Sequence, residues 1–200
     1  GQITGSGALV LSQNTTIQSG TTTLTRLNFN GTTLTLGTDT TKAELSYTST
    51  ALSLTNDTNL VLKNNSSLSL KELRLAGNNK FFTLGDDNGS IGVLNTVSFV
   101  GADGGANATT MNIKSGSVLN ITGSVDGTSG EGSLIVGHWD ASSIINLAGE
   151  MNALSAHFSA VSSTSDKAKV NVDNGGVLNI KGLDLAYKRD PGGGVSVILN

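Results

Sequence analysis

Short segments in which an apolar, a small polar and a second apolar residue follow one another recur along the chain. Eight segments have this form: 34–36, 52–54, 68–70, 111–113, 119–121, 170–172, 178–180 and 195–197. Because successive side chains of a strand point to opposite faces, each segment predicts a very short strand with two residues inward and one outward. Residues that favour turns separate the segments. The pattern predicts an all-β chain.

The clearest internal repeat pairs residues 111–123 with residues 170–182. Seven of these thirteen positions are identical, and the two segments are offset by 59 residues. This offset is interpreted as three coils of about 20 residues, a repeat length typical of a solenoid. With coils of that length, the chain would hold about eight to ten of them.

A right-handed parallel β-helix with three faces accounts for strands this short. One coil holds too few apolar residues to keep a core away from water by itself. Stacked coils place each Leu, Ile or Val on its counterpart one coil away, and each strand hydrogen-bonds to two neighbours. An antiparallel sandwich would favour longer strands and frequent Asn-Gly hairpins. We therefore predict the β-helix.

We expect residues 1–200 to form a single β-helix domain that is an interior piece of a longer chain, because no signal-peptide pattern opens the sequence. Helical spacing is weak throughout. The only candidate runs from Ile144 to Val161, with its apolar residues from Leu147 to Phe158 at helical spacing, and it is interrupted by Gly149. We interpret it as a strand followed by a loop or short helical decoration over residues 148–168.

The composition favours a surface that is polar but almost uncharged. Charged residues make up 14% of the chain, against about 25% in ordinary soluble proteins. The net charge of −3 gives no electrostatic reason to expect nucleic acid as a partner. Cysteine is absent, which excludes a disulfide framework and thiolate metal sites.

Two phrases, NGGVLNI at residues 174–180 and SGSVLNITG at residues 115–123, resemble the passenger domains of Gram-negative autotransporters and related type V secreted adhesins. The general repeat pattern is similar over most of the chain, but the individual motifs are degenerate. It implies an extracellular β-helical stalk, exported through an outer-membrane barrel and then displayed at the cell surface or released. The implied partners are a host receptor, a glycan or a second copy. Membrane contact would come only from a C-terminal barrel outside these residues.

His138, Trp139 and Asp140 form a cluster of unusual residues in a plain chain. A histidine beside an aspartate can act as an oriented base, but adjacent residues of a strand face opposite ways. We therefore interpret the cluster as a turn with an aromatic anchor. An exposed Trp139 would stack on a sugar ring, so these three residues are the candidates for ligand binding.

We predict no catalytic residue, cofactor or metal. The carboxylates are scattered and do not recur at the spacing of the coils. Two loops, 86–90 and 102–107, resemble calcium loops, but they lack the alternating acidic ligands of an EF-hand. The chain is therefore predicted not to be an enzyme.

Asparagine occupies the middle of four of the short segments: Asn112, Asn120, Asn171 and Asn179. We predict that these outward amides stack as ladders between coils. Such ladders would stiffen the solenoid, and a flat polar face with little charge would favour self-association.

Together these features predict a structural stalk and adhesin, located outside the cell or at the surface of a Gram-negative bacterium. Two alternatives stay open. One is a segment of a secreted toxin passenger. The other is a β-helical carbohydrate-active enzyme or carbohydrate-binding module, because polysaccharide lyases and hydrolases use the same fold.

Overall fold

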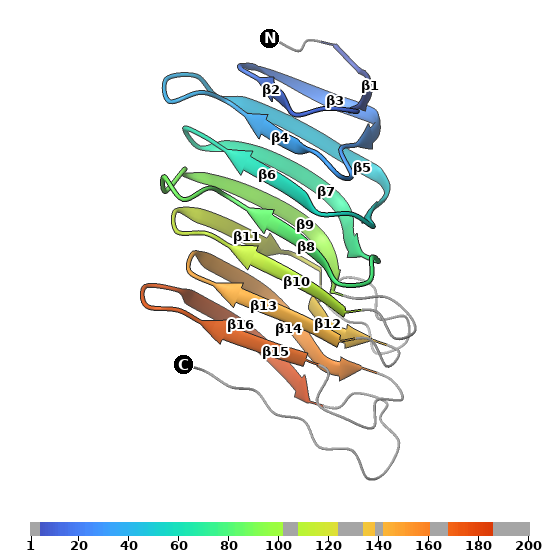
Figure 1. The fold of residues 1–200 in the computed structure, drawn as a ribbon, viewed down its shortest axis with the longest axis vertical. Coiled ribbons are helices and arrows are strands. Elements are labelled where there is room, and N and C mark those ends of the chain that lie inside the picture. The colour runs from blue at the N-terminus through green and yellow to red at the C-terminus, as the bar shows by residue number, and fades with distance from the viewer. Residues whose placement is uncertain (1–4, 102–107, 124–133, 139–141, 161–167, 186–200) are drawn as a thin grey trace.

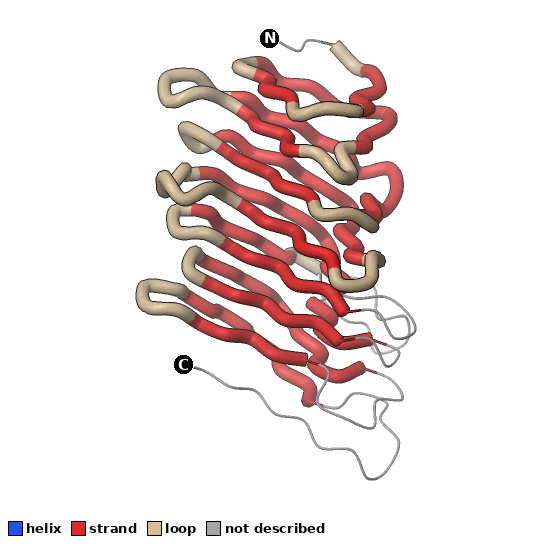
Figure 2. The backbone as a smooth tube through the Cα atoms, in the orientation of Figure 1, coloured by secondary structure: helices blue, strands red, loops and turns tan. Residues whose placement is uncertain are grey.

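The computed structural model is a stack of parallel strands joined by turns (Figure 1). It describes residues 5–101, 108–123, 134–138, 142–160 and 168–185, and none of these residues is helical (Figure 2). From the N-terminal end to the C-terminal end the chain winds as a right-handed superhelix. The predicted all-β fold, a right-handed parallel β-helix, is confirmed.

Two sheets make up the stack, and every strand pairing in them is parallel. The first sheet contains β2 (Thr15–Ile17), β4 (Thr33–Leu36), β6 (Thr58–Leu62), β8 (Lys80–Leu84), β10 (Ala108–Ile113), β13 (Ser142–Leu147) and β15 (Ala168–Val172). The second contains β1 (Gly7–Val10), β3 (Gly20–Asn28), β5 (Ala43–Leu54), β7 (Ser66–Leu75), β9 (Gly92–Gly101), β11 (Ser117–Ile121), β12 (Leu134–His138), β14 (Glu150–Ala160) and β16 (Val177–Leu185).

The second sheet bends and supplies two faces. The first half of β9, up to Thr96, pairs with β11, whereas Phe99 and the two residues after it pair with β12. The strand β14 likewise pairs with β11 through one half and with β12 through the other. Each long strand therefore crosses a corner. The first sheet is the first face, and the two halves of the long strands form the second and third faces.

The coils are longer than predicted. Met111 pairs with Ile145, and Ile145 pairs with Val170. The repeat offset of 59 residues therefore spans two coils of 34 and 25 residues, not three of about 20. The longer of these two coils includes residues 124–133, which lie between β11 and β12 in the sequence. The described residues form seven coils preceded by β1. The predicted eight to ten coils refer to the whole chain, of which residues 186–200 lie outside the description.

Most of the predicted loop or helical decoration at residues 148–168 is instead a strand, β14. Met151 and Ala153 point inward with a period of two, and Leu154 is exposed at the corner. After Leu154 the inward residues again alternate with outward ones, but they occupy even-numbered instead of odd-numbered positions. This change of phase imitates helical spacing in the sequence, which explains the wrong prediction. Residues 161–167 lie outside the described part of the chain.

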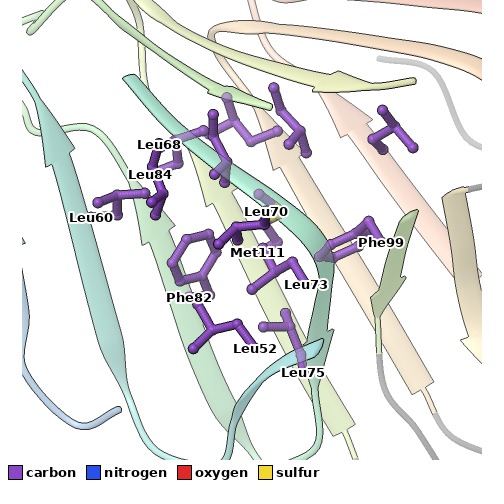
Figure 3. Close-up of a cluster of buried hydrophobic side chains, with 14 of the residues drawn as sticks. Leu52, Leu60, Leu68, Leu70, Leu73, Leu75, Phe82, Leu84, Phe99 and Met111 are labelled. Atoms are coloured by element: carbon purple, nitrogen blue, oxygen red, sulfur yellow. The ribbon is translucent and has the colours of Figure 1, made fainter. Parts of the chain in front are cut away.

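Aliphatic side chains form continuous columns through the interior, and Figure 3 shows part of this core. One column on the first face consists of Leu34, Leu60, Leu84, Ile113, Leu147 and Val172. One on the second face consists of Leu45, Leu68, Leu94, Leu119, Met151 and Leu178. Burying each such side chain contributes roughly 1.5–3 kcal/mol. The inward positions of the short segments, with 195–197 outside the described residues, are therefore confirmed.

The corner where the first face meets the second is lined by a column of small residues. In coil order these are Gly20, Ala43, Ser66, Gly92, Ser117, Gly149 and Gly176. The residues are small because little space is left for a side chain at this corner. A Cβ built on Gly149 would lie 2.4 Å from the Ser117 carbonyl oxygen, and one on Gly176 would lie 2.2 Å from that of Leu147. The tight corner therefore excludes larger side chains.

Candidate functional site

The predicted ligand-binding cluster lies at the end of β12. His138 is the last residue of that strand, and its backbone is paired with Ala160 on β14. Its side chain, Trp139 and Asp140 lie outside what the structure describes. The proposed stacking role of Trp139 stays a prediction.

The first face carries a ladder of asparagine amides on its outer side. Asn112 Nδ2 donates to Thr83 Oγ1 at 3.5 Å, Asn146 Nδ2 to Asn112 Oδ1 at 2.8 Å, and Asn171 Nδ2 to Asn146 Oδ1 at 2.7 Å. All the donors point toward the preceding coil. The three amides are half-buried, so each ladder bond links two coils from the outside of the solenoid.

A second ladder runs along the second face. Asn120 Nδ2 donates to Asn95 Oδ1 at 3.0 Å, Asn152 Nδ2 to Asn120 Oδ1 at 2.9 Å, and Asn179 Nδ2 to Asn152 Oδ1 at 2.8 Å. Asn152 Nδ2 also donates to Glu150 Oε1 at 2.8 Å. The predicted stacking of outward asparagines between coils is confirmed.

Three ladder members were missed by the sequence reasoning: Asn95, Asn146 and Asn152. Asn146 lies between Ile145 and Leu147, so the alternation of apolar and polar residues was sufficient to find it. Asn95 precedes a threonine and Asn152 precedes an alanine. Thr96 and Ala153 are nevertheless buried, so a search for small inward residues would have found both.

The ladders leave hydrogen-bonding capacity unused. An amide side chain has two N–H donors and two acceptor lone pairs. A bond to the preceding coil and one to the following coil use half of that capacity, and Asn152 uses three quarters of it because it also donates to Glu150. The two outer faces therefore present rows of amide groups, one per coil, to the solvent.

We expect the Asn146→Ala variant to be less stable than the wild type by about 1–2 kcal/mol, because Asn112 Oδ1 and Asn171 Nδ2 each lose a half-buried partner. Urea unfolding followed by circular dichroism measures the difference. The matched control is Asn174→Ala, which changes an exposed turn residue. Equal stability of the two variants would show that the ladder does not stabilise the solenoid.

The acidic loop at residues 86–90 is closed by its own aspartate. Asp86 Oδ1 accepts the backbone N–H groups of Asn88 and Ser90, each at 3.1 Å, and Asp86 Oδ2 accepts the Ser90 hydroxyl at 2.8 Å. Burial raises the pKa of Asp86, but these hydrogen bonds together outweigh it and hold the pKa below its ordinary value. The Asp87 carboxylate pairs with Lys114 at 2.7 Å.

A hollow of about 530 Å³ lies at the turns that lead into the second face, lined among others by Lys63, Asn65 and Ile91. Lys63 Nζ pairs with Asp39 at 2.9 Å, which raises the pKa of Lys63 through a hydrogen bond and charge attraction.

Among the described residues, no group of three or more His, Cys, Asp or Glu side chains is placed to hold a metal ion. Residues 102–107 lie outside the description.

The outer side of the third face carries two buried apolar residues next to a histidine. Val100, Ile135 and His157 are successive neighbours there, and their core-facing neighbours are Phe99, Leu134 and Ala156. Although they face away from the core, these three side chains are only 6–7% exposed. His157, one of the two histidines, is therefore a buried residue of this outer cluster rather than an exposed catalytic group.

Comparison with protein-family models, curated sequences and solved structures found no significant match. In the described part of the chain, no helix is long and apolar enough to cross a membrane.

Proposed function

We propose that the chain is a segment of an extracellular passenger of the type V secreted class, which serves as a stiff stalk and as a surface for adhesion. One observation carries this proposal: two amide ladders run on the outside of an unbroken stack of parallel coils. The likeness of its repeats to autotransporter passengers supports the extracellular location at a Gram-negative surface.

Stiffness follows from the pairing. Each of β5, β7, β9, β11 and β14 is hydrogen-bonded to strands on both sides, and the core columns pass from coil to coil without interruption. Bending the rod would separate the strands on its convex side and break the hydrogen bonds between them. A stalk that holds a binding surface away from a cell needs this resistance.

The outer faces suit contact more than chemistry. The described ion pairs are spread singly over the surface: Lys42 with Glu44, Lys63 with Asp39, Arg74 with Glu72 and Lys114 with Asp87. Hydrolysis of a glycosidic bond needs two carboxyl groups that face one substrate. Four described carboxylates are each engaged by a lysine or arginine, and no two of these four face one another, which favours a binding role over an enzymatic one.

Beads coated with the chain test this function. We expect them to attach to cultured epithelial cells, or to clump with one another, far more than beads coated with albumin or with the urea-unfolded chain. If the beads neither attached to the cells nor clumped with one another, the adhesive role would be contradicted. Release of reducing sugar from any polysaccharide by the folded chain would contradict the non-enzymatic assignment.

A further inference from the structure

Five exposed residues form a row along the corner where the long strands pass from the second face to the third: Lys71, Val97, Thr122, Leu154 and Lys181. We call this the outer corner row. Its order follows from the residues on either side, which pair coil by coil. The strands that carry it, β7, β9, β11, β14 and β16, lie one after another in Figure 1.

Two surface hollows lie along the outer corner row. The hollow at its N-terminal end has a volume of about 290 Å³, and Lys71 and Val97 line it beside Thr50 of β5. The hollow at its C-terminal end has a volume of about 330 Å³ and is lined by Thr122, Leu154 and Lys181. Because the two hollows follow one row across the coils, we refer to both of them together as the groove.

The groove is cationic at both ends and apolar between them. Lys71 and Lys181 make no ion pair with any described residue. The nearby Glu72 carboxylate is engaged by Arg74 at 2.6 Å. Between the two lysines, the side chains of Val97 and Leu154 are 45% and 39% exposed. A ligand of this groove would therefore carry separated negative charges and apolar patches.

The second asparagine ladder forms one wall of the C-terminal hollow, through Asn120, Asn152 and Asn179. These amides repeat with the spacing of neighbouring strands, about 4.8 Å. Asn120 and Asn179 each keep one unused N–H donor, and all three amide oxygens keep an unused lone pair, whereas both N–H groups of Asn152 are engaged. Hydroxyl groups are good partners for such donors and acceptors, and the length of a sugar ring in a linear polysaccharide is close to one strand spacing. The wall therefore offers one amide for each sugar.

We propose that the outer corner row binds a linear polysaccharide that carries carboxylate groups. The sugar hydroxyls bond to the ladder amides, and the ring C–H faces pack on Val97 and Leu154. Carboxylates pair with Lys71 and Lys181, which are four strand spacings, about 19 Å, apart. This inference rests on the proposed adhesive function and names the ligand class of that surface.

An acidic peptide fits the groove less well. Extended peptides are bound mainly through their backbone, at the unpaired edge of a sheet. Along the outer corner row, the strands from β7 to β14 are paired on both sides, and the backbone N–H groups of Thr122 and the next residue are bonded to β9. The groove therefore offers side chains and no free strand edge.

Calorimetric titration with galacturonic acid octamers tests the proposal, with neutral maltooctaose and an octaglutamate peptide as comparison ligands. We expect the uronate octamer alone to bind, with an affinity that falls as salt is added.

The double variant Lys71→Gln, Lys181→Gln should lose about tenfold or more in affinity for the uronate octamer, the equivalent of two exposed charge contacts. Leu154→Ser should weaken binding as well. Lys169→Gln, an exposed lysine on the first face, should leave the affinity unchanged.

Equal binding of maltooctaose or octaglutamate would overturn the proposal, as would an unchanged affinity in a double variant whose circular dichroism spectrum matches the wild type. The bead assay separates this inference from the proposed function. If beads coated with the double variant attach as well as the wild type, the groove assignment fails and the adhesive function stands. If wild-type beads do not attach although the uronate octamer binds, the groove assignment stands and the adhesive function fails.

Discussion

The Leu94→Ala variant is expected to lose about 3–4 kcal/mol of stability, well within the range known for truncating a buried leucine side chain to alanine. Leu94 is fully buried in the middle of its column, between Leu68 and Leu119, which are fully buried too. The neighbouring coils are held at the strand spacing by backbone hydrogen bonds, so they cannot close the cavity. Urea unfolding followed by circular dichroism measures the loss.

Leu154→Ala is the matched control for this prediction. Leu154 is also a strand leucine, but it is 39% exposed at the outer corner. Its truncation should cost less than about 1 kcal/mol, since little apolar area returns to water. If both variants lost the same stability, the aliphatic columns would not be the main source of the solenoid's stability.

The Gly92→Val variant is expected to destabilise the chain by about 3 kcal/mol or more, the upper range for overpacking a core. A Cβ on Gly92 would lie 2.1 Å from the Leu62 Cβ and 2.7 Å from the Leu62 carbonyl oxygen. The second contact is with backbone, which a rotamer change cannot relieve. Thermal unfolding should show a lower midpoint.

Gly7→Val separates this clash from the general effect of replacing a glycine. A Cβ on Gly7 meets no atom within 4 Å, and Gly7, like Gly92, has an ordinary backbone conformation. We expect this variant to unfold at the wild-type midpoint. A similar loss of stability in both variants would show that the small-residue corner is not sterically tight.

The fold was predictable because a short strand in a stack must alternate inward and outward residues. Leu68 and Leu70, with Ser69 between them, are one clear case, and both leucines are buried. The small residues at the corner between the first and second faces do not stand out by any alternation of this kind. Gly92 and Ser117 occupy the same position in successive coils. Glycine and serine also occur in the turns, so their presence in the sequence does not mark this corner.

Coil length could not be predicted from the repeat alone. The segments 111–123 and 170–182 are alike because their side chains occupy equivalent positions two coils apart. The coil between them has the same inward pattern with different residues, such as Met151 where the others have Leu119 and Leu178. Stacking selects for volume and apolar character rather than identity, so an intervening coil is invisible to a search for identical residues.

The candidate site was predictable only in part. The amide ladders follow from the outward position of asparagine in a period-two pattern. The outer corner row does not, because it needs the bend in the long strands. Lys71 and Lys181 are far apart in the sequence, and the register that places Val97 and Leu154 between them comes only from the strand pairing.

Pulsed electron paramagnetic resonance with pairs of spin labels tests the stacked register most directly. The chain has no cysteine, so Ser46→Cys and Asn179→Cys give two unique labelling sites on one outer column of the second face. Five strand spacings predict a separation of about 24 Å. Moving the first label to Ser69, one coil along, should shorten the distance by only about 5 Å. A broad distribution, or a change that does not match one strand spacing, would contradict the parallel solenoid.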